Sequence, residues 1–138
     1  RYEGTVTNPF REAAATEEEA PGTGYLEMNG QEVFRFAISQ VPESVQEVLD
    51  KAGWQKEEVG HYVLHQANAR IIQSIAKRLG EPEEKFPMNL QNYGNMSSAS
   101  IPVLLDELNR EGKLERGEKL VLSGFGAGLT YGATALIW

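Results

Sequence analysis

Apolar residues recur every three or four positions between residues 32 and 52, and this spacing predicts an amphipathic helix. The segment carries two apolar stripes: Phe34, Ala37, Ile38 and Val41, followed by Val45, Val48, Leu49 and Ala52. Pro42 lies between the stripes. Because a proline ring interrupts the hydrogen-bond ladder of a helix, it predicts either two helices or one kinked helix. Gly53 stands where a helix C-cap is expected.

The same spacing predicts two more helices, over residues 68–79 and 97–110. Gly80 closes the first of them, and Pro102 lies in the first turn of the second, where proline is tolerated. Residues 91–95 are predicted to form a loop. Short β-prone runs predict strands at four places: 61–65, 86–88, 119–123 and 131–138. Strands that alternate with helices are typical of a layered α/β domain.

The beginning of the chain has a different character. Residues 1–24 contain Asn8-Pro9, a Glu-rich stretch and Pro21-Gly22, which are typical of turns and solvated loops and predict an irregular lead-in. Residues 25–28 alternate like a short strand. A chain of 138 residues has the size of one ordinary domain, so we expect a single domain over residues 1–138.

Composition narrows the possible classes of function. The chain has no Cys, which excludes disulfides, thiolate metal sites and a cysteine nucleophile carried by this chain. The net charge of −7 has the wrong sign for a general nucleic-acid binder. No apolar run approaches the roughly 20 residues of a membrane span, and no hydrophobic signal core is present. We therefore expect a cytoplasmic protein that has no nucleic-acid partner and no membrane span.

The first candidate site is His65-Gln66-Ala67-Asn68, where a predicted strand meets the following helix. Ligands of α/β folds sit at the carboxyl ends of strands. A neutral imidazole there can donate a hydrogen bond to a carbonyl oxygen that gains negative charge, or act as acid or base near neutral pH. A structural histidine is the competing interpretation, and the motif alone favours it. His61 and His65 are four residues apart, but without a nearby carboxylate or Cys we expect no metal site.

The second candidate is the segment 92–100, in which small residues surround Asn95 just before a predicted helix. In that position the side-chain amide of Asn95 can point into a cavity and donate a hydrogen bond to a developing oxyanion. Asn and Ser are also ordinary N-cap residues. The capping interpretation is favoured when this segment is considered alone.

The third candidate is the glycine-rich segment 124–130, which joins two predicted strands. Glycine permits a positive φ and lets backbone N–H groups approach a ligand closely. The segment lacks the Lys and the following helix of a phosphate-binding loop, so nucleotide binding is not expected. A tight hairpin and a loop that approaches a ligand remain equal alternatives.

Charge is distributed unevenly along the chain. Residues 59–80 contain no acidic residue, whereas Arg70, Lys77 and Arg78 lie there, and helical geometry puts Arg70 and Lys77 on one face. On an acidic chain such a basic patch can guide an acidic partner protein or an anionic cofactor tail towards His65. An ordinary solvated helix face is the alternative, and the pattern alone favours it.

The three motifs, in this order and at this approximate spacing, resemble the thiolase-like condensing enzymes, most closely the β-ketoacyl-acyl carrier protein synthase III family. The resemblance covers the chain from about Tyr25 onward and corresponds to the C-terminal half of such an enzyme. It implies one thiolase-like half: a mixed β-sheet with packed helices, in layers. It also implies that an N-terminal half absent from this chain supplies a Cys nucleophile, so we expect the isolated chain to be inactive.

The resemblance also implies an acyltransferase reaction of fatty acid biosynthesis. An acyl group passes from acyl-CoA to the Cys, malonyl-acyl carrier protein loses carbon dioxide, and the resulting carbanion condenses with the acyl thioester. By the same resemblance, His65 and Asn95 stabilise the enolate of the malonyl thioester. The backbone N–H of Ala127, where the family usually has Gly, lines the second oxyanion hole, and its methyl is expected to tighten the acyl pocket. Phe125 lies near the acyl and pantetheine channel.

The implied partners are acyl carrier protein, acyl-CoA, the N-terminal half and, for the whole enzyme, a second copy in a homodimer. Arg70, Lys77 and Arg78 are expected to dock the carrier protein or CoA. No cofactor is expected, since the substrates carry CoA or phosphopantetheine.

The segment 94–99 has Met96 where synthase III often has Thr, and it is equally similar to the same segment of chalcone-synthase-like enzymes. Those enzymes, however, generally have Pro-Gly-Gly after the catalytic His, where this chain has Gln66-Ala67-Asn68. A condensing half of a polyketide synthase or of a hydroxymethylglutaryl-CoA-synthase-like enzyme, and a non-catalytic carrier-protein-binding module, are the alternatives.

Overall fold

Three strands form one mixed sheet in the computed structural model, which describes residues 28–138. Strand β1 (Val59–Leu64) pairs in parallel with β2 (Lys119–Gly126), and β2 pairs antiparallel with β3 (Thr130–Ile137). The α-helices are α1 (Gly30–Ala52), α2 (Ala69–Leu79), α3 (Leu90–Tyr93) and α4 (Ser100–Arg110). The 3-10 helices are η1 (Lys56–Glu58), η2 (Glu83–Lys85) and η3 (Ser97–Ala99). The predicted lead-in over 1–24 and nearly all of the predicted strand over 25–28 lie outside the described residues.

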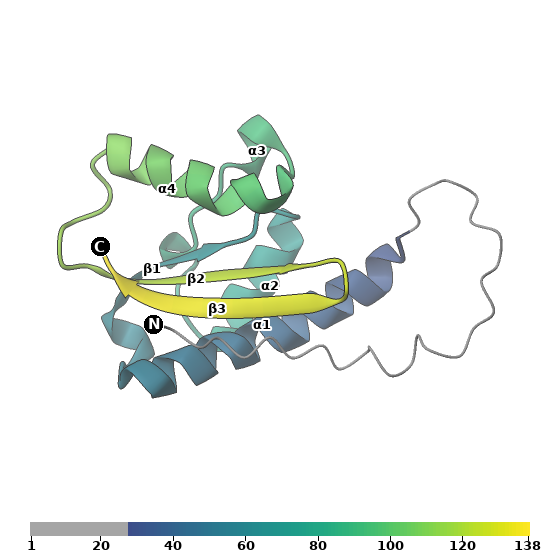
Figure 1. The fold of residues 1–138 in the computed structure, drawn as a ribbon, viewed down its shortest axis with the longest axis horizontal. Helices are drawn as coiled ribbons and strands as arrows, with labels where there is room; N and C mark the ends of the chain where they lie inside the picture. Colours follow the sequence, from purple (N-terminus) through teal and green to yellow (C-terminus); the bar gives the residue numbers. More distant parts are fainter. Residues whose placement is uncertain (1–27) are drawn as a thin grey trace.

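Helices cover both faces of the sheet, with α1 and α2 on one face and α4 on the other (Figure 1). Strand β1 is buried on both faces: Tyr62 and Leu64 belong to the cluster under α1 and α2, whereas Val63 belongs to the cluster under α4. A strand with two covered faces reads as a continuous apolar run, as this one does. The layered α/β architecture with a mixed sheet and packed helices is therefore confirmed.

Helix α1 runs through Pro42 as one helix, which excludes the alternative of two separate helices. Val41, Pro42 and Val45 are all buried. Burying two valines contributes about 1.5–3 kcal/mol each, which offsets the roughly 3 kcal/mol cost of an internal proline. The predicted C-cap is confirmed, since Gly53 has φ of 69°. Although α1 has 23 residues, no helix of residues 28–138 is both long and apolar enough to cross a membrane.

The segment between α2 and α4 differs most from the prediction. Residues 86–88 form no strand: Pro87 has no N–H for a ladder, and its carbonyl accepts from the Gln66 side chain at 3.4 Å. Phe86 is instead buried, with its ring stacked on Tyr62 at 4.8 Å. Part of the predicted loop over 91–95 belongs to the single turn α3, and the predicted helix over 97–110 begins with the 3-10 turn η3.

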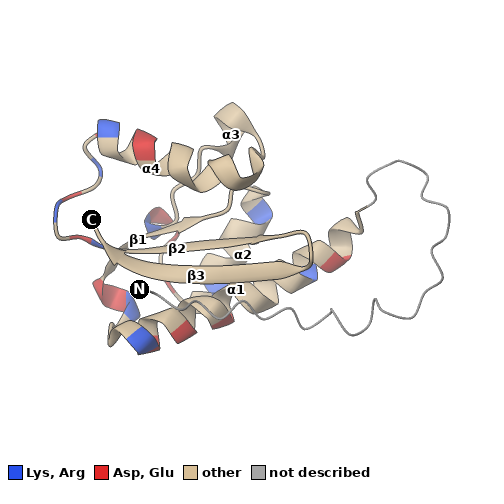
Figure 2. Ribbon diagram, in the orientation of Figure 1, with Lys and Arg blue, Asp and Glu red and all other residues tan. Residues whose placement is uncertain are grey.

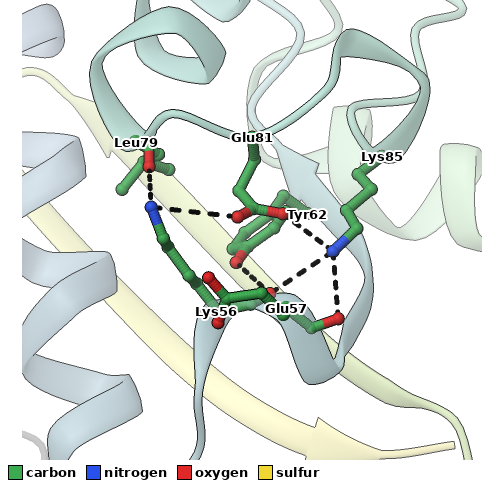
Figure 3. A network of polar contacts seen from close by, with 6 residues as sticks. All are labelled: Lys56, Glu57, Tyr62, Leu79, Glu81 and Lys85. Atoms are coloured by element: carbon green, nitrogen blue, oxygen red, sulfur yellow. Dashed lines mark hydrogen bonds and ion pairs between the residues drawn. The ribbon is translucent and has the colours of Figure 1, made fainter.

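A polar network ties the start of β1 to the end of α2, at the edge of the sheet opposite His65 (Figure 3). The Glu81 carboxylate, whose side chain is 5% exposed, lies 2.8 Å from Lys85 Nζ and 4.0 Å from Lys56 Nζ. Lys56 Nζ also donates to Leu79 O at 2.9 Å, which satisfies a carbonyl at the end of α2. Tyr62 Oη donates to Lys56 O at 3.0 Å. The network therefore joins four segments of the chain.

We expect Glu81→Ala to lower the free energy of unfolding by about 1–3 kcal/mol, because it leaves two lysines without their shared, nearly buried carboxylate. Urea unfolding followed by circular dichroism measures the change. Glu47→Ala is the matched control, since the Glu47–Lys51 pair is 64% exposed on both sides and should contribute less than about 0.5 kcal/mol. Equal effects of the two substitutions would show that the Glu81 network adds nothing to stability.

Candidate active site

The three motifs lie at one end of the sheet. Because β1 and β2 are parallel, their carboxyl ends meet at the same edge, and the β2–β3 hairpin begins there (Figure 1). Helix α4 begins at this edge as well, since a Cβ built on Gly124 would lie 3.8 Å from Ile101 Cδ1 in its first turn. The loop after β1, the segment that precedes α4 and the hairpin therefore converge on one region.

His65 is positioned by the strand that it follows. Its backbone N–H donates to Ser123 O at 2.9 Å, which extends the β1–β2 ladder by one residue. Its ring is half-buried and packs edge-to-face against Phe125, with the ring centroids 5.3 Å apart. Burial lowers the pKa of the His65 imidazole below its ordinary value. The ring is therefore neutral near pH 7 and keeps one N–H as a hydrogen-bond donor.

Asn95 is oriented by its own local turn. Its Oδ1 accepts from Ser97 N at 2.9 Å, which closes a local turn. The favoured N-cap interpretation is wrong for Asn95, because the N-caps of η3 and α4 are Met96 and Ala99 and neither helix has a side-chain capping bond. The Nδ2 group has no hydrogen-bond partner among residues 28–138, and the side chain is exposed. The turn and donation to a ligand are therefore compatible, because the Asn95 oxygen holds the backbone while its NH₂ group remains available.

The glycine-rich segment is a hairpin, as one of the two sequence interpretations predicts. Gly126 pairs with Thr130, so residues 127–129 form its tip, and Thr130 Oγ1 donates to Ala127 O at 3.1 Å. Gly128 has φ of 139°, and a Cβ there would approach Thr130 Cγ2 to 2.7 Å, so the tip requires glycine. Ala127 is exposed, so the hairpin does not exclude an approach by a ligand.

The segments that carry the three motifs are themselves uncharged. Residues 59–69, 86–105 and 120–138 contain no Lys, Arg, Asp or Glu, whereas α1 and α2, which pack beside them, carry charged residues (Figure 2). Preorganised neutral donors stabilise a developing oxyanion most strongly when a bound substrate or partner excludes water. The chemistry that fits this arrangement is stabilisation of negative charge on a carbonyl oxygen. The residues 28–138 contain no group of three or more His, Cys, Asp or Glu side chains arranged to hold a metal ion.

The basic residues of α2 divide into two sets. Arg70 and Lys77 line a shallow hollow between α1 and α2, together with Phe34 and Glu83, so the predicted common face is confirmed. Arg78 is exposed but is not part of the lining. Glu83 introduces an acid into the hollow that the acid-free run of residues 59–80 did not reveal.

Comparison with known proteins identifies the family. The family model for the C-terminal part of 3-oxoacyl-[acyl-carrier-protein] synthase III matches residues 49–138. The chain belongs to this family. The matched residues include His65, Asn95 and the glycine-rich hairpin.

Several synthase III proteins are similar to most of this chain. A β-ketoacyl-[acyl-carrier-protein] synthase III of Clostridium acetobutylicum is 46% identical over 133 residues, which cover 96% of this chain and 39% of that protein. The crystal structure of the Aquifex aeolicus synthase III has a TM-score of 0.82 at 45% identity, covering 86% of this chain and 39% of the other. The Thermus thermophilus synthase III has a TM-score of 0.85 at 38% identity, with coverages of 97% and 44%. The chain therefore spans less than half the length of each of these proteins.

Gln66 has a role at this site that its position in the sequence did not indicate. It is completely buried, its Nε2 donates to Leu64 O at 2.9 Å, and its Oε1 accepts from Asn89 N at 3.1 Å. A Gln that directly follows an apolar strand was the available signal. The contact between Gln66 and Asn89 was not predictable from the sequence. Asn89 lies 23 residues further along the chain, in a segment that was expected to follow a strand.

We expect the imidazole of His65 to titrate below the ordinary histidine value of about 6.5, and Phe125→Ala to raise its pKa towards that value by admitting water to the ring. Nuclear magnetic resonance of the imidazole C–H signals measures the midpoint, with His61→Gln used for assignment. Trp54→Phe is the control, because Trp54 packs against Lys119 at the opposite edge of the sheet.

The same shift has a consequence for stability. The unfolded chain takes up a proton on His65 more readily than the folded chain, so the contribution of neutral His65 to stability is present above pH 6.5 and is lost as the pH falls below that value. If His65 has the same pKa in Phe125→Ala as in the unchanged chain, burial by Phe125 is not the cause of the lowered pKa.

Proposed function

We propose that this chain is the C-terminal catalytic part of a β-ketoacyl-acyl carrier protein synthase III that condenses malonyl-acyl carrier protein with an acyl group derived from acyl-CoA, in the cytoplasm. The observation that carries the proposal is the pair of neutral donors in uncharged segments at the carboxyl end of β1 and before α4: the His65 imidazole, whose pKa is lowered by burial, and the Asn95 amide. The synthase III relatives favour this function over the chalcone-synthase-like alternative. Residues 1–138 form one domain in this proposal.

In the proposed reaction, His65 and Asn95 both donate to the carbonyl oxygen of the malonyl thioester. When the bond to the carboxylate breaks, carbon dioxide leaves and the electron pair forms an enolate whose negative charge resides on that oxygen. Two neutral donors stabilise this charge without the desolvation cost of a buried cation. The enolate carbon then attacks the acyl thioester and expels the thiolate to which the acyl group was bound.

The hairpin supplies the second part of the proposed site. Phe125 packs on the His65 ring and so borders the channel for the acyl chain and pantetheine. Ala127 is exposed at the hairpin tip, and its backbone N–H is the proposed donor to the acyl carbonyl oxygen during the attack. In the proposed reaction the acyl group is bound to the thiol of a Cys. This chain has no Cys, so we assign that residue to an N-terminal half that pairs with the chain.

We expect the isolated 138-residue chain to show no condensation, and addition of a Cys-bearing synthase III N-terminal half to restore it. In that assembly His65→Ala and Asn95→Ala should each reduce malonyl decarboxylation about a hundredfold to a thousandfold, because each removes one oxyanion donor. Release of carbon dioxide from labelled malonyl-acyl carrier protein measures the rate. Asn109→Ala is the matched control, since this asparagine is exposed at the end of α4 away from the site.

Two results would contradict this proposal. Condensation by the chain alone would show that the nucleophile does not come from another polypeptide segment. Unchanged decarboxylation in both His65→Ala and Asn95→Ala would remove the role assigned to the donor pair.

The proposed partners are acyl-CoA and the acidic acyl carrier protein, with a homodimer as the whole enzyme and no bound cofactor. We assign carrier-protein docking to Arg70, Lys77 and Arg78. The shared hollow of Arg70 and Lys77 supports this assignment, because two cations on one surface attract a negatively charged partner. Docking without catalysis is the second candidate function, and it would be supported if the isolated chain bound carrier protein.

We expect Arg70→Glu to weaken binding of acyl carrier protein about tenfold or more at low salt and to reduce the dependence of binding on salt. Titration calorimetry at two salt concentrations measures both effects. Arg110→Glu is the matched control, because Arg110 is exposed at the end of α4 and pairs only with Asp106 among the described residues. Equal weakening by both substitutions would indicate a non-specific charge effect, and absence of binding by the unchanged chain at low salt would count against docking.

A further inference from the structure

A series of hydrogen bonds connects the end of β1, directly before His65, with the segment that contains Asn95. Its first part is Gln66, whose completely buried side chain bridges Leu64 O, at the end of β1, and the backbone N–H of Asn89. Asn89 is itself 3% exposed. Since a buried amide left without partners costs about 1–3 kcal/mol, this bridge holds the two segments at one separation.

The second part of the chain centres on Glu107 of α4. Its Oε2 accepts from Asn89 Nδ2 at 2.5 Å, and its Oε1 accepts from Tyr93 Oη at 2.8 Å. Hydrogen bonds to an ionised carboxylate are stronger than neutral ones. The contact also raises the pKa of the Tyr93 hydroxyl, which keeps that hydroxyl protonated as a donor. One carboxylate therefore contacts the residues at both ends of α3.

Helix α3 depends on these contacts because it is too short to stand alone. It has four residues, and its N-cap Asn89 makes no side-chain capping bond. A single helical turn has an unfavourable nucleation cost and is not stable in isolation. Glu107, in contrast, lies on a helix anchored in the core by Leu104 and Leu108. The position of α3 is therefore set from α4, and Asn95 follows the last residue of α3 by two positions.

We propose that Glu107 is a positioning residue of the site. By bridging Asn89 and Tyr93 it holds α3 in place, and α3 in turn sets the position of the Asn95 amide. The Gln66 bridge ties the same segment to the end of β1, next to His65. This inference rests on the proposed function for its catalytic consequence, but its structural part can be tested without activity. Segment 86–105 contains no charged residue of its own, so the bridge comes from outside the segment.

Amide hydrogen exchange on the whole 138-residue chain tests the structural part. We expect Glu107→Ala to accelerate exchange of the Ser97 and Met96 amides about tenfold, because both residues follow α3 directly and their bonds to Asn95 Oδ1 and Ser100 Oγ loosen when α3 loses its support. The amide of Val121 in β2 should keep its rate, which separates local loosening from global unfolding. Magnetisation-transfer nuclear magnetic resonance measures the fast amides.

Two variants separate the bridge from the charge. Glu107→Gln is expected to restore nearly unchanged exchange, since its Oε1 can accept from Asn89 Nδ2 while its Nε2 donates to Tyr93 Oη. Asp106→Ala removes a negative charge from the neighbouring position of α4, which contacts Arg110, and should leave the Ser97 amide unaffected. If Glu107→Ala fails to fold, Tyr93→Phe removes one link only and is expected to accelerate exchange about threefold.

The catalytic part is tested in the assembly with the Cys-bearing half. Glu107→Ala should lower kcat for malonyl decarboxylation about tenfold with little change in KM, and Glu107→Gln should recover most of it. Unchanged exchange at Ser97 in Glu107→Ala, or equal acceleration in Asp106→Ala, would overturn the inference even if Asn95→Ala abolishes decarboxylation. Conversely, accelerated exchange together with full activity of Asn95→Ala would leave the positioning intact and refute the proposed function.

Discussion

The parallel pairing of β1 with β2 is the constraint on which the site depends. Two parallel strands end at the same edge of a sheet, so the residue after β1 and the hairpin after β2 must lie beside each other. The backbone bond from His65 to Ser123 continues this pairing into the loop, and Phe125, two residues further along β2, then meets the His65 ring. Burial of β1 on both faces keeps the pair in register.

Neutrality is the second property of this region. Long uncharged segments surround His65, Asn95 and the hairpin, whereas the acidic excess of the chain is distributed over other surfaces. The lowered pKa of His65 has the same origin, because burial penalises the charged imidazolium. A site of this kind favours chemistry in which charge appears on the substrate rather than on the protein, which agrees with the enolate of the proposed reaction.

Much of the fold was predictable from the sequence, and the failures have identifiable causes. The helices over 68–79 and 97–110 and the strands around 61–65 and 119–123 follow from periodicity, since each has one or two faces packed in the core. The continuous helix α1 was undecided because the burial that compensates for Pro42 is a tertiary effect. The strand predicted over 86–88 was wrong because the side chain of Gln66 satisfies that segment in place of a neighbouring strand.

The sequence alone determined which chemical groups the site has and where along the chain they occur. His65 and Asn95, the glycine-rich turn, the basic helix face and the missing Cys are all local properties, and their order indicated the family. Only the three-dimensional structure decided that Asn95 closes a turn with its oxygen and keeps its NH₂ group available, that Phe125 packs on His65, and that Glu107 contacts both ends of α3. These contacts join residues on separate elements, and no periodicity within one element encodes the distance between two of them.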